Sequence, residues 1–325
     1  MKALVQRVYG PPDSLNWEDV PDPVPGEGEV LVRVHATSVN PYDWHFLRGE
    51  PYAARLMTGG FGLRRPPVGV LGCDLAGRVE TAGTEFGPGD DVYALLPGGA
   101  HAEYVCVPES LLARMPANLS PEQAATLPMA GVTALLALRG VRPGHRVLVN
   151  GASGGVGTFA VQLAKALGAH VDAVCGAANA DLVRSLGAGH VVDYRTEDFT
   201  RVGRRYDFVL DIAGGRSVFA CRRILEHGGT FVAVGGPAGR WLQPAGHVFA
   251  ALAAGPFARR RVVLADAVGC PDKKAVLGEL AAFAERGELT PVLDRTYPFD
   301  DLRAAFAHQE AGHARGKVAV TRAAR

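Results

Sequence analysis

The chain has few cysteines, almost no excess charge of either sign and no long apolar run, and each shortage excludes a class of protein. Its five cysteines are scattered over 325 residues without a C-x-x-C pair, which argues against disulfides and a four-cysteine zinc lobe. With 34 basic and 33 acidic residues, no field favours nucleic acid or an anionic membrane. The chain also lacks a membrane-length apolar run and a signal-peptide core, so we expect a cytoplasmic protein with no membrane partner.

A glycine-rich turn between a strand and a helix is the strongest functional signal. An apolar run at 146–150 leads into the turn GASGGVG at 151–157, which is followed by apolar residues at helical spacing and a second apolar run at 170–175. The dinucleotide fingerprint G-x-G-x-x-G falls on Ala152, Gly154 and Gly157. The backbone of this turn and the helix N-terminus would hold phosphates. The predicted nucleotide contacts are Gly151, Ala152, Ser153, Gly154, Gly155, Val156 and Gly157.

The order of strand and helix patterns predicts an α/β protein with two domains. Up to residue 118 the chain reads as short strands separated by Gly and Pro, typical of an irregular antiparallel barrel. From 119 to 287 six strand candidates alternate with helices, which predicts a doubly wound parallel sheet. The tail reads strand, helix, strand and should return to the first domain. We therefore expect a barrel domain at 1–118 and 288–325, and an inserted nucleotide-binding domain at 119–287.

Six motifs follow one another along nearly the whole chain. They are VNPYDWHFLRG (39–49), GVLGCDLAGRVETAG (69–83), GDDVYALLPGG (89–99), AATLPMAGVTALLAL (124–138), NGASGGVGTFAVQLAKALGA (150–169) and RGKVAVT (315–321). In order and spacing they resemble the medium-chain dehydrogenase/reductase superfamily, in its zinc-independent quinone oxidoreductase branch. The resemblance implies a GroES-like barrel domain and a Rossmann domain.

The resemblance also implies that no catalytic zinc is bound. Zinc-dependent members have a Cys-His pair in the first motif, a His-Glu pair in the second, and a Cys just before A-G-V-T. The corresponding positions here hold Asn40 and Pro41, Cys73 and Asp74, and Met129, which do not supply three good ligands. Without a metal to acidify an alcohol, the expected reaction is hydride addition to a quinone or an α,β-unsaturated carbonyl.

The loop after the second strand of the nucleotide-binding domain indicates which nicotinamide cofactor is used. Residues 175–179 (CGAAN) lack the acid that would hold a ribose 2′-hydroxyl, which favours NADPH. NADH remains the alternative, because the Ser and basic residue that NADPH-using relatives place there are also missing. Tyr194 matches a tyrosine that relatives use on the 2′-phosphate. The other cofactor contacts expected from this loop and from the resemblance are Asn40, Thr133, Cys175, Asn179, Gly235, Gly236, Gly316 and Lys317.

The resemblance places Asn40 beside the nicotinamide and the substrate carbonyl. A neutral amide can donate a hydrogen bond to a developing enolate without a particular protonation state, so Asn40 is a catalytic candidate. Tyr42, His45 and Tyr52 are candidate proton donors, with solvent as the alternative.

The apolar segment 241–261 can line or cover a pocket, which predicts a small hydrophobic or aromatic conjugated carbonyl as substrate; the alternative is a helix that packs on the sheet or on a partner subunit. Residues 260–266 resemble the edge strand through which relatives pair, so we expect a homodimer. Two alternative functions remain open. One is an enoyl reductase acting on a polyketide-like or thioester intermediate, with a basic rim of Arg48, Arg55, Arg64 and Arg65. The other is an NADPH-binding sensor with little turnover.

Overall fold

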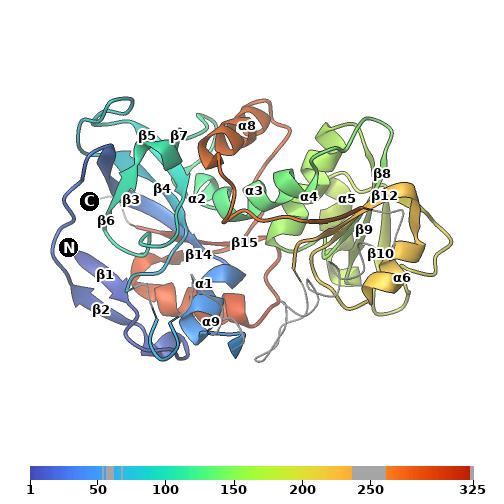
Figure 1. Ribbon diagram of the computed structural model, residues 1–325, viewed down its shortest axis with the longest axis horizontal. Coiled ribbons are helices and arrows are strands. Elements are labelled where there is room, and N and C mark those ends of the chain that lie inside the picture. The colour runs from blue at the N-terminus through green and yellow to red at the C-terminus, as the bar shows by residue number, and fades with distance from the viewer. Residues whose placement is uncertain (53–54, 56–61, 67–68, 236–260, 323–325) are drawn as a thin grey trace. The chain divides into compact units, whose positions relative to one another are not determined.

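The computed structural model describes residues 1–52, 55, 62–66, 69–235 and 261–322 (Figure 1). The chain divides into two compact units, Met1–Val132 with Val268–Arg325 (unit 1) and Thr133–Ala267 (unit 2). These limits differ from the expected ones, because residues 119–132 and 268–287 lie in unit 1. In that unit α2 (Pro121–Ala124) packs on the strands β3 and β4, and α8 (Lys273–Glu285) packs on β5 and β7.

Unit 1 is built on a seven-stranded sheet of the GroES-like type. Along the sheet the strands are β14 (Leu293–Pro298), β15 (Lys317–Thr321), β3 (Glu29–Val39), β4 (Asp74–Val79), β5 (Asp91–Leu95) and β7 (Leu112–Arg114), with β6 (Tyr104–Pro108) also paired to β3. A separate hairpin joins β1 (Lys2–Val5) to β2 (Asn16–Asp19). The C-terminal β15 runs antiparallel to β3, with Val318 opposite Val39. This pairing brings the last motif of the sequence beside the first.

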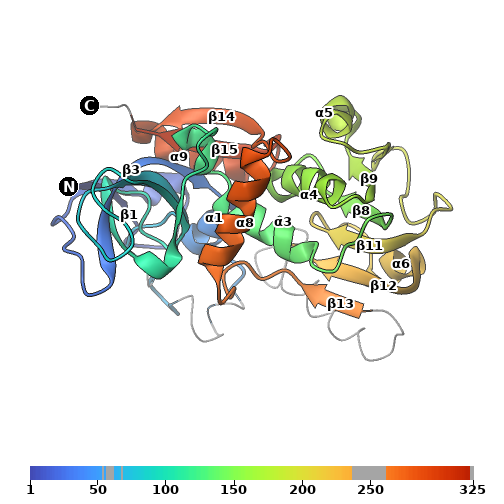
Figure 2. The same ribbon diagram turned by 90° about the horizontal axis from the view of Figure 1, so that it is seen from above.

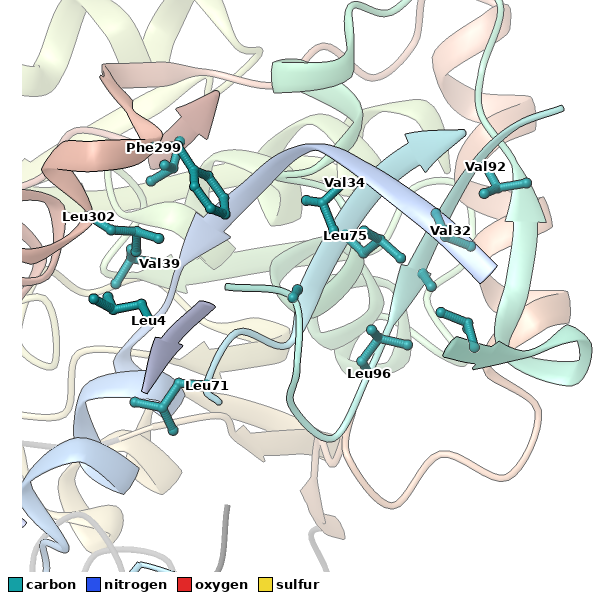
Figure 3. Packing of buried hydrophobic residues seen from close by; sticks show 14 of the residues in the cluster. Leu4, Val32, Val34, Val39, Leu71, Leu75, Val92, Leu96, Phe299 and Leu302 are labelled. Carbon is teal, nitrogen blue, oxygen red and sulfur yellow. The ribbon is translucent and has the colours of Figure 1, made fainter. Parts of the chain in front are cut away.

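The core of unit 1 follows from alternation along β3. Val30, Val32 and Val34 are buried, and the residues between them are only partly buried. They belong to one hydrophobic cluster with Leu75 of β4 and Val92 of β5, and Figure 3 shows Val32, Val34, Leu75 and Val92 in it. Each side chain of this kind stabilises the fold by about 1.5–3 kcal/mol when it leaves water completely.

The helices of unit 1 are short. They are α1 (Pro41–Arg48), α2, the first half of α3 (Pro128–Ala137), α8 and α9 (Leu302–Glu310), with 3-10 turns at Pro12–Ser14, Glu109–Leu111 and Phe299–Asp301. The sequence sets both ends of α1. Pro41 occupies its first position, the Asp43 carboxylate accepts the Asn40 backbone N–H at 2.8 Å, and Gly49 ends the helix at φ 62°.

Unit 2 is a Rossmann domain with a six-stranded parallel sheet. The strands lie in the order β10 (His190–Asp193), β9 (His170–Cys175), β8 (Arg146–Asn150), β11 (Tyr206–Asp211), β12 (Leu225–Ala233) and β13 (Arg261–Leu264). The expected doubly wound sheet is therefore confirmed, with strand positions within a few residues of those predicted. The direction of winding reverses between β8 and β11, where α/β proteins bind their ligands. Figure 2 shows β13 at one edge, beside β12.

Among the described residues of unit 2, the helices are α4 (Gly155–Ala166), α5 (Ala180–Ser185), α6 (Val218–Arg223) and the second half of α3, with a 3-10 turn at Ala177–Asn179. The large buried side chains Phe199, Tyr206 and Phe231 contribute to its core. None of the described helices in either unit is long and apolar enough to cross a membrane.

Candidate active site

The glycine-rich turn of unit 2 joins β8 to α4. Gly151 has a φ of 90°, which other residues rarely adopt, and the N–H groups of Gly151 and Ala152 donate to the Val174 carbonyl at 3.1 and 3.0 Å. Gly154 is the N-cap residue of α4 and offers no side chain to the first helical N–H groups. The turn is therefore tied to β9, and the helix N-terminus retains the backbone donors that suit a phosphate.

Gly154 and Gly157, the second and third positions of the fingerprint, have different structural roles. A Cβ on Gly157 would lie 2.1 Å from the Gly151 carbonyl oxygen, so the fold itself requires glycine there. A Cβ on Gly154 would have nothing closer than that same oxygen at 3.6 Å, which is ordinary contact. The fold does not require glycine at 154, and the bare backbone there fits the close approach of a pyrophosphate.

The loop after β9 lies against the glycine-rich turn. Asn179 Nδ2 donates to Ser153 Oγ at 3.1 Å, while Asn179 Oδ1 is buried without a hydrogen-bond partner among the described residues. Gly176 lies against Tyr194, because a Cβ on this glycine would be 3.7 Å from the tyrosine ring. Tyr194 is 53% exposed, and the Arg195 guanidinium lies 5.8 Å from its ring centroid. These placements bring Ser153, Cys175, Asn179 and Tyr194 to one end of the sheet.

An acidic residue that the sequence reading missed also lies at this end. Asp193, the last residue of β10, is the register partner of Cys175 on β9. Its Oδ1 accepts the Arg195 backbone N–H at 3.1 Å, so it caps the turn that carries Tyr194. The sequence could have indicated this placement. Cys175 and Asp193 each end a predicted strand, and the carboxyl ends of neighbouring parallel strands lie at the same edge of a sheet.

For the remaining predicted cofactor residues of unit 2, the structure shows burial and packing where it describes them. Thr133 is 7% exposed on α3. Gly235 follows β12, where a Cβ would meet the Ile212 carbonyl oxygen at 2.6 Å, so glycine is required for packing. Gly236 and the segment 241–260 lie outside the described residues.

In unit 1 the side chain of Asn40 lies in a buried polar cluster. The residue is 2% exposed, and its Nδ2 donates to Asp74 Oδ2 at 2.8 Å. The same nitrogen has longer contacts of 3.4 Å with Ser38 Oγ and Cys73 Sγ. Its Oδ1 accepts a hydrogen bond from Lys317 Nζ. The Asn40 amide is thus held at both ends.

Asp74 is the centre of this cluster. Its Oδ2 accepts from Ser38 Oγ at 2.5 Å and from Asn40, and lies 3.3 Å from Lys317 Nζ. Its Oδ1 accepts the Met129 backbone N–H at 2.8 Å, in the first turn of α3. The four positions that hold zinc ligands or their neighbours in zinc-dependent members, Asn40, Cys73, Asp74 and Met129, are therefore brought together around a carboxylate.

Lys317 is not placed as a surface residue. It is 3% exposed, and its backbone N–H donates to the Val292 carbonyl at 2.8 Å. Gly316 before it has a φ of 89°, and a Cβ there would lie 2.3 Å from the same oxygen, so only glycine fits. The sequence reading expected both residues to contact the cofactor, and missed the contacts of Lys317 with Asn40 and Asp74. The distance of 277 residues between Lys317 and Asn40 left no local signal.

A second buried carboxylate, Asp43, lies next to this cluster. Burial, followed by the nearby charge of Asp74, raises the pKa of Asp43 to about 7. Burial and the same two carboxylates raise the pKa of the Cys73 thiol, whose Sγ lies 3.8 Å from Asp43 Oδ2. Cys73 is therefore a neutral packing residue. The buried cluster therefore holds a carboxyl group whose pKa lies near neutral pH.

The three candidate proton donors lie on or just after α1. His45 Nδ1 lies 2.9 Å from the Glu50 carbonyl oxygen, so this nitrogen carries the hydrogen and the neutral ring has only an acceptor left at Nε2. Burial lowers its pKa, so a smaller fraction of the ring carries the second proton that an acid catalyst would donate. The Tyr42 ring packs on Phe46 with a centroid distance of 4.6 Å, and Arg55 lies 4.8 Å from the Tyr52 ring centroid. The contacts of His45 argue against it as the acid, and the identity of the proton donor stays a prediction.

Within the described part of the chain, no three His, Cys, Asp or Glu side chains are grouped so that they could hold a metal ion. The expected absence of zinc stays a prediction.

Two family models match the chain. The alcohol dehydrogenase GroES-like domain matches residues 26–117, and the zinc-binding dehydrogenase model matches residues 186–320. The chain is 34% identical to the mitochondrial NAD(P)H oxidoreductase RTN4IP1 of Mus musculus, over 90% of this chain and 81% of that protein. It is 33% identical to the chloroplast envelope quinone oxidoreductase homolog of Arabidopsis thaliana, over 98% of each chain. It is also 33% identical to the chloroplastic NADPH-dependent alkenal/one oxidoreductase of the same plant, over 98% of this chain and 79% of that protein.

Solved structures give the same assignment. The quinone oxidoreductase from Coxiella burnetii has a TM-score of 0.83 at 29% identity and covers 99% of each chain. The CurK enoyl reductase has a TM-score of 0.83 at 27% identity, covering 98% of this chain and 99% of that one. The chain therefore belongs to the medium-chain dehydrogenase/reductase superfamily, in its zinc-independent quinone oxidoreductase branch. It is an NAD(P)H-dependent oxidoreductase.

The comparisons contradict the expected cytoplasmic location. The three relatives described above carry mitochondrial or chloroplast names. The absence of a signal-peptide core was therefore an insufficient basis for that expectation.

The two fingerprint glycines should respond differently to one added methyl group. Gly157→Ala should lower the melting temperature by several degrees, because overpacking of this kind costs about 1–3 kcal/mol. Gly154→Ala should melt within about two degrees of the unmodified protein, since its Cβ has room, yet weaken NADPH binding about tenfold or more by blocking the pyrophosphate. Thermal unfolding and fluorescence titration with NADPH measure both. Equal destabilisation by the two variants would contradict this division of roles.

The raised pKa of Asp43 predicts a dependence of stability on pH. The unfolded chain releases this proton near pH 4, whereas the folded protein holds it until about pH 7. Between these values the unfolded state binds fewer protons, so Asp43 lowers the free energy of unfolding as pH rises through this window. Asp43→Asn keeps an acceptor for the Asn40 N–H and removes the titration. The difference in melting temperature, variant minus unmodified protein, should therefore rise from pH 4 to pH 7 and stay level above pH 7. A difference that does not change with pH would show that Asp43 ionises normally.

Proposed function

We propose that the protein is an NADPH-dependent, zinc-independent reductase that transfers hydride to a quinone or to the C=C bond of an α,β-unsaturated carbonyl. The observation that carries this proposal is the Asn40 amide, held between Lys317 and Asp74 at a position where zinc-dependent members have a ligand. A site organised by an amide and an ion pair suits stabilisation of an enolate by hydrogen bonds. Relatives named as quinone and alkenal/one oxidoreductases support the same substrate class.

Within this proposal Asn40 acts on the oxygen of the substrate. A reduced nicotinamide held at the glycine-rich turn would supply a hydride to the carbon β to the carbonyl; the C=C electron pair would then form the new double bond between the α carbon and the carbonyl carbon, and the C=O pair would move to the oxygen, giving an enolate. One Nδ2 hydrogen of Asn40 is committed to Asp74 at 2.8 Å, while its other contacts are 3.4 Å long. The second Nδ2 hydrogen, which has only these long contacts, is the group that would donate to the enolate oxygen. A proton from Tyr42, Tyr52 or solvent then completes the reduction at the α carbon.

The preference for NADPH rests on the end of β9. No acid occupies Gly176 or its neighbours in the loop, and Tyr194, with the Arg195 guanidinium 5.8 Å from its ring centroid, lies against this glycine, where a 2′-phosphate would be held. Asp193 is the opposing feature, but its carboxylate is used to cap the Arg195 N–H. We therefore propose that NADPH binds more tightly than NADH.

The enoyl reductase alternative is favoured by the similarity to CurK. Its expected basic rim is weaker than the sequence indicated. Arg48 forms a bidentate ion pair with Glu310 at 2.7 and 2.9 Å, and Arg55 donates to the carbonyls of Gly49 and Arg48 while stacking on Tyr9. Arg48 and Arg55 are therefore engaged within the protein, which weakens the argument for a thioester-bound substrate.

We also propose a homodimer formed through β13. This strand lies at the edge of the unit 2 sheet, and its side chains Val263 and Leu264 are more than one third exposed. An edge strand with unpaired backbone groups and apolar side chains is suited to pairing with a second copy.

A substrate panel tests the proposed reaction. Oxidation of NADPH should be fast with a naphthoquinone, a cyclic enone and a long 2-alkenal, and undetectable with a simple ketone. Activity should survive a chelator, and Asn40→Ala should lower kcat by about 100-fold, the usual cost of losing one oriented oxyanion donor. Reduction of the ketone that is lost with chelator would overturn the proposal. Saturable NADPH binding without turnover of any compound would instead support the sensor alternative.

Two substitutions at one glycine test the cofactor preference. Gly176→Asp installs a carboxylate beside Tyr194 at a position with room for a Cβ, and Gly176→Ala adds the same Cβ without the charge. The aspartate should weaken NADPH binding about tenfold or more by repelling the 2′-phosphate, and leave NADH binding unchanged or improved. The alanine should change both Kd values little. Equal weakening of both cofactors by the aspartate would place the 2′-phosphate elsewhere.

A further inference from the structure

The structure gives Lys317 surroundings that a contact with a diffusible cofactor does not explain. The lysine begins β15, whose pairing with β3 places Val318 opposite Val39, next to Asn40. Its side chain is 4% exposed, and its ammonium contacts Asn40 Oδ1 and Asp74 Oδ2. A lysine is rarely buried unless it is paired, because the cost of removing its charge from water must be offset.

We propose that Lys317 is a positioning residue, which fixes the orientation of the Asn40 amide. This inference rests on the proposed function, in which Asn40 donates to the substrate oxygen. It differs from the role expected from the sequence, in which Lys317 contacts the cofactor.

The orientation follows from the hydrogen-bonding capacity of the three groups. An ammonium has only donors and a carboxylate only acceptors, whereas the two ends of an amide differ. Lys317 Nζ therefore requires the amide oxygen, and Asp74 Oδ2 requires the amide nitrogen at 2.8 Å. If the amide were rotated by 180°, its oxygen would face the carboxylate and its N–H groups would face the ammonium. Both contacts would then be repulsive.

The Asp74 end of this arrangement cannot rotate away. Ser38 Oγ donates to its Oδ2 at 2.5 Å, and the Met129 backbone N–H donates to its Oδ1 at 2.8 Å. Lys317 is held from the other side by its backbone bond to the Val292 carbonyl and by the conformation of Gly316. The amide thus lies between two fixed charges of opposite sign, which leaves one N–H in a constant direction.

A double-mutant cycle between residues 317 and 40 tests this proposal. The variants are Lys317→Met, Asn40→Ala and the two together, with kcat measured for one conjugated substrate and Kd for NADPH measured by fluorescence. If Lys317 acts through Asn40, Lys317→Met should lower kcat by about 10- to 100-fold, in keeping with the cost of a misplaced donor. It should change the Kd for NADPH less than twofold, and in the Asn40→Ala background it should cause no further loss of kcat.

A charge-balanced variant separates orientation from stability. Lys317→Met alone leaves Asp74 buried without its counter-ion, which is destabilising. Lys317→Met combined with Asp74→Asn removes both charges while nearly keeping the side-chain volumes, and an asparagine at 74 can still accept the Met129 N–H. This pair should regain much of the melting temperature lost in Lys317→Met. Its kcat should stay low, because an amide at 74 that accepts from Met129 turns its nitrogen toward Asn40 and favours the reversed amide.

The outcomes separate this inference from the proposed function. If Asn40→Ala is fully active, the proposed role of Asn40 fails and the positioning role fails with it. If Asn40→Ala is impaired but Lys317→Met lowers kcat by an independent factor in that background, only the positioning role fails. A large rise in the Kd for NADPH with unchanged kcat in Lys317→Met would make the lysine a cofactor contact. Recovery of kcat together with stability in the charge-balanced variant would show that Lys317 serves stability alone.

Discussion

The polar site of unit 1 depends on one buried ion pair, between Lys317 and Asp74. Each charge alone would be costly in this environment, since breaking such a pair by removing one partner costs about 3–5 kcal/mol. The pair is tolerated because Asp74 also receives donors from Ser38, Asn40 and the Met129 backbone. The same bonds that offset desolvation fix the positions of the first, second and fourth motifs relative to the last. Stability and the proposed chemistry thus rely on the same atoms.

Much of the fold could be predicted from the sequence, because it is encoded locally. The glycine turn, the alternation along β3 and the six strands of unit 2 each have a pattern within a window of a few residues, and the structure has them close to where they were expected. The limits of the two units differ from the expected ones, because α2 and α8 belong to unit 1. Their assignment follows from their packing on β3 and β7, and no local sequence pattern indicates that packing. Helical spacing shows that α8 is a helix but not which sheet it covers.

The candidate site was predicted unevenly for the same reason. Asn40 was singled out from its motif, and Gly154 and Gly157 from the fingerprint. Lys317 and Asp74 were singled out for other roles, but their contacts with Asn40 were not predicted, because Lys317 lies 277 residues away and reaches it only through the antiparallel pairing of β15 with β3. His45 shows the converse. Its residue type suits acid catalysis, but its hydrogen bond to the Glu50 carbonyl and its lowered pKa depend on burial that the sequence does not reveal.

The charges of the buried cluster around Asp74 can be compared with what the proposed reaction requires. Two carboxyl groups, Asp43 and Asp74, share one ammonium, so the cluster is neutral only when one carboxyl keeps its proton. Asp74 receives the ammonium and three hydrogen-bond donors, while Asp43 has the Asn40 backbone N–H and the Cys73 thiol. The proton therefore belongs on Asp43, in agreement with its raised pKa. An unbalanced buried carboxylate would oppose the negative charge that hydride addition creates on a substrate oxygen. Below about pH 7, where Asp43 keeps its proton, this repulsion is absent and Lys317 compensates Asp74, so the electrostatics of the cluster permit the enolate that Asn40 is proposed to stabilise.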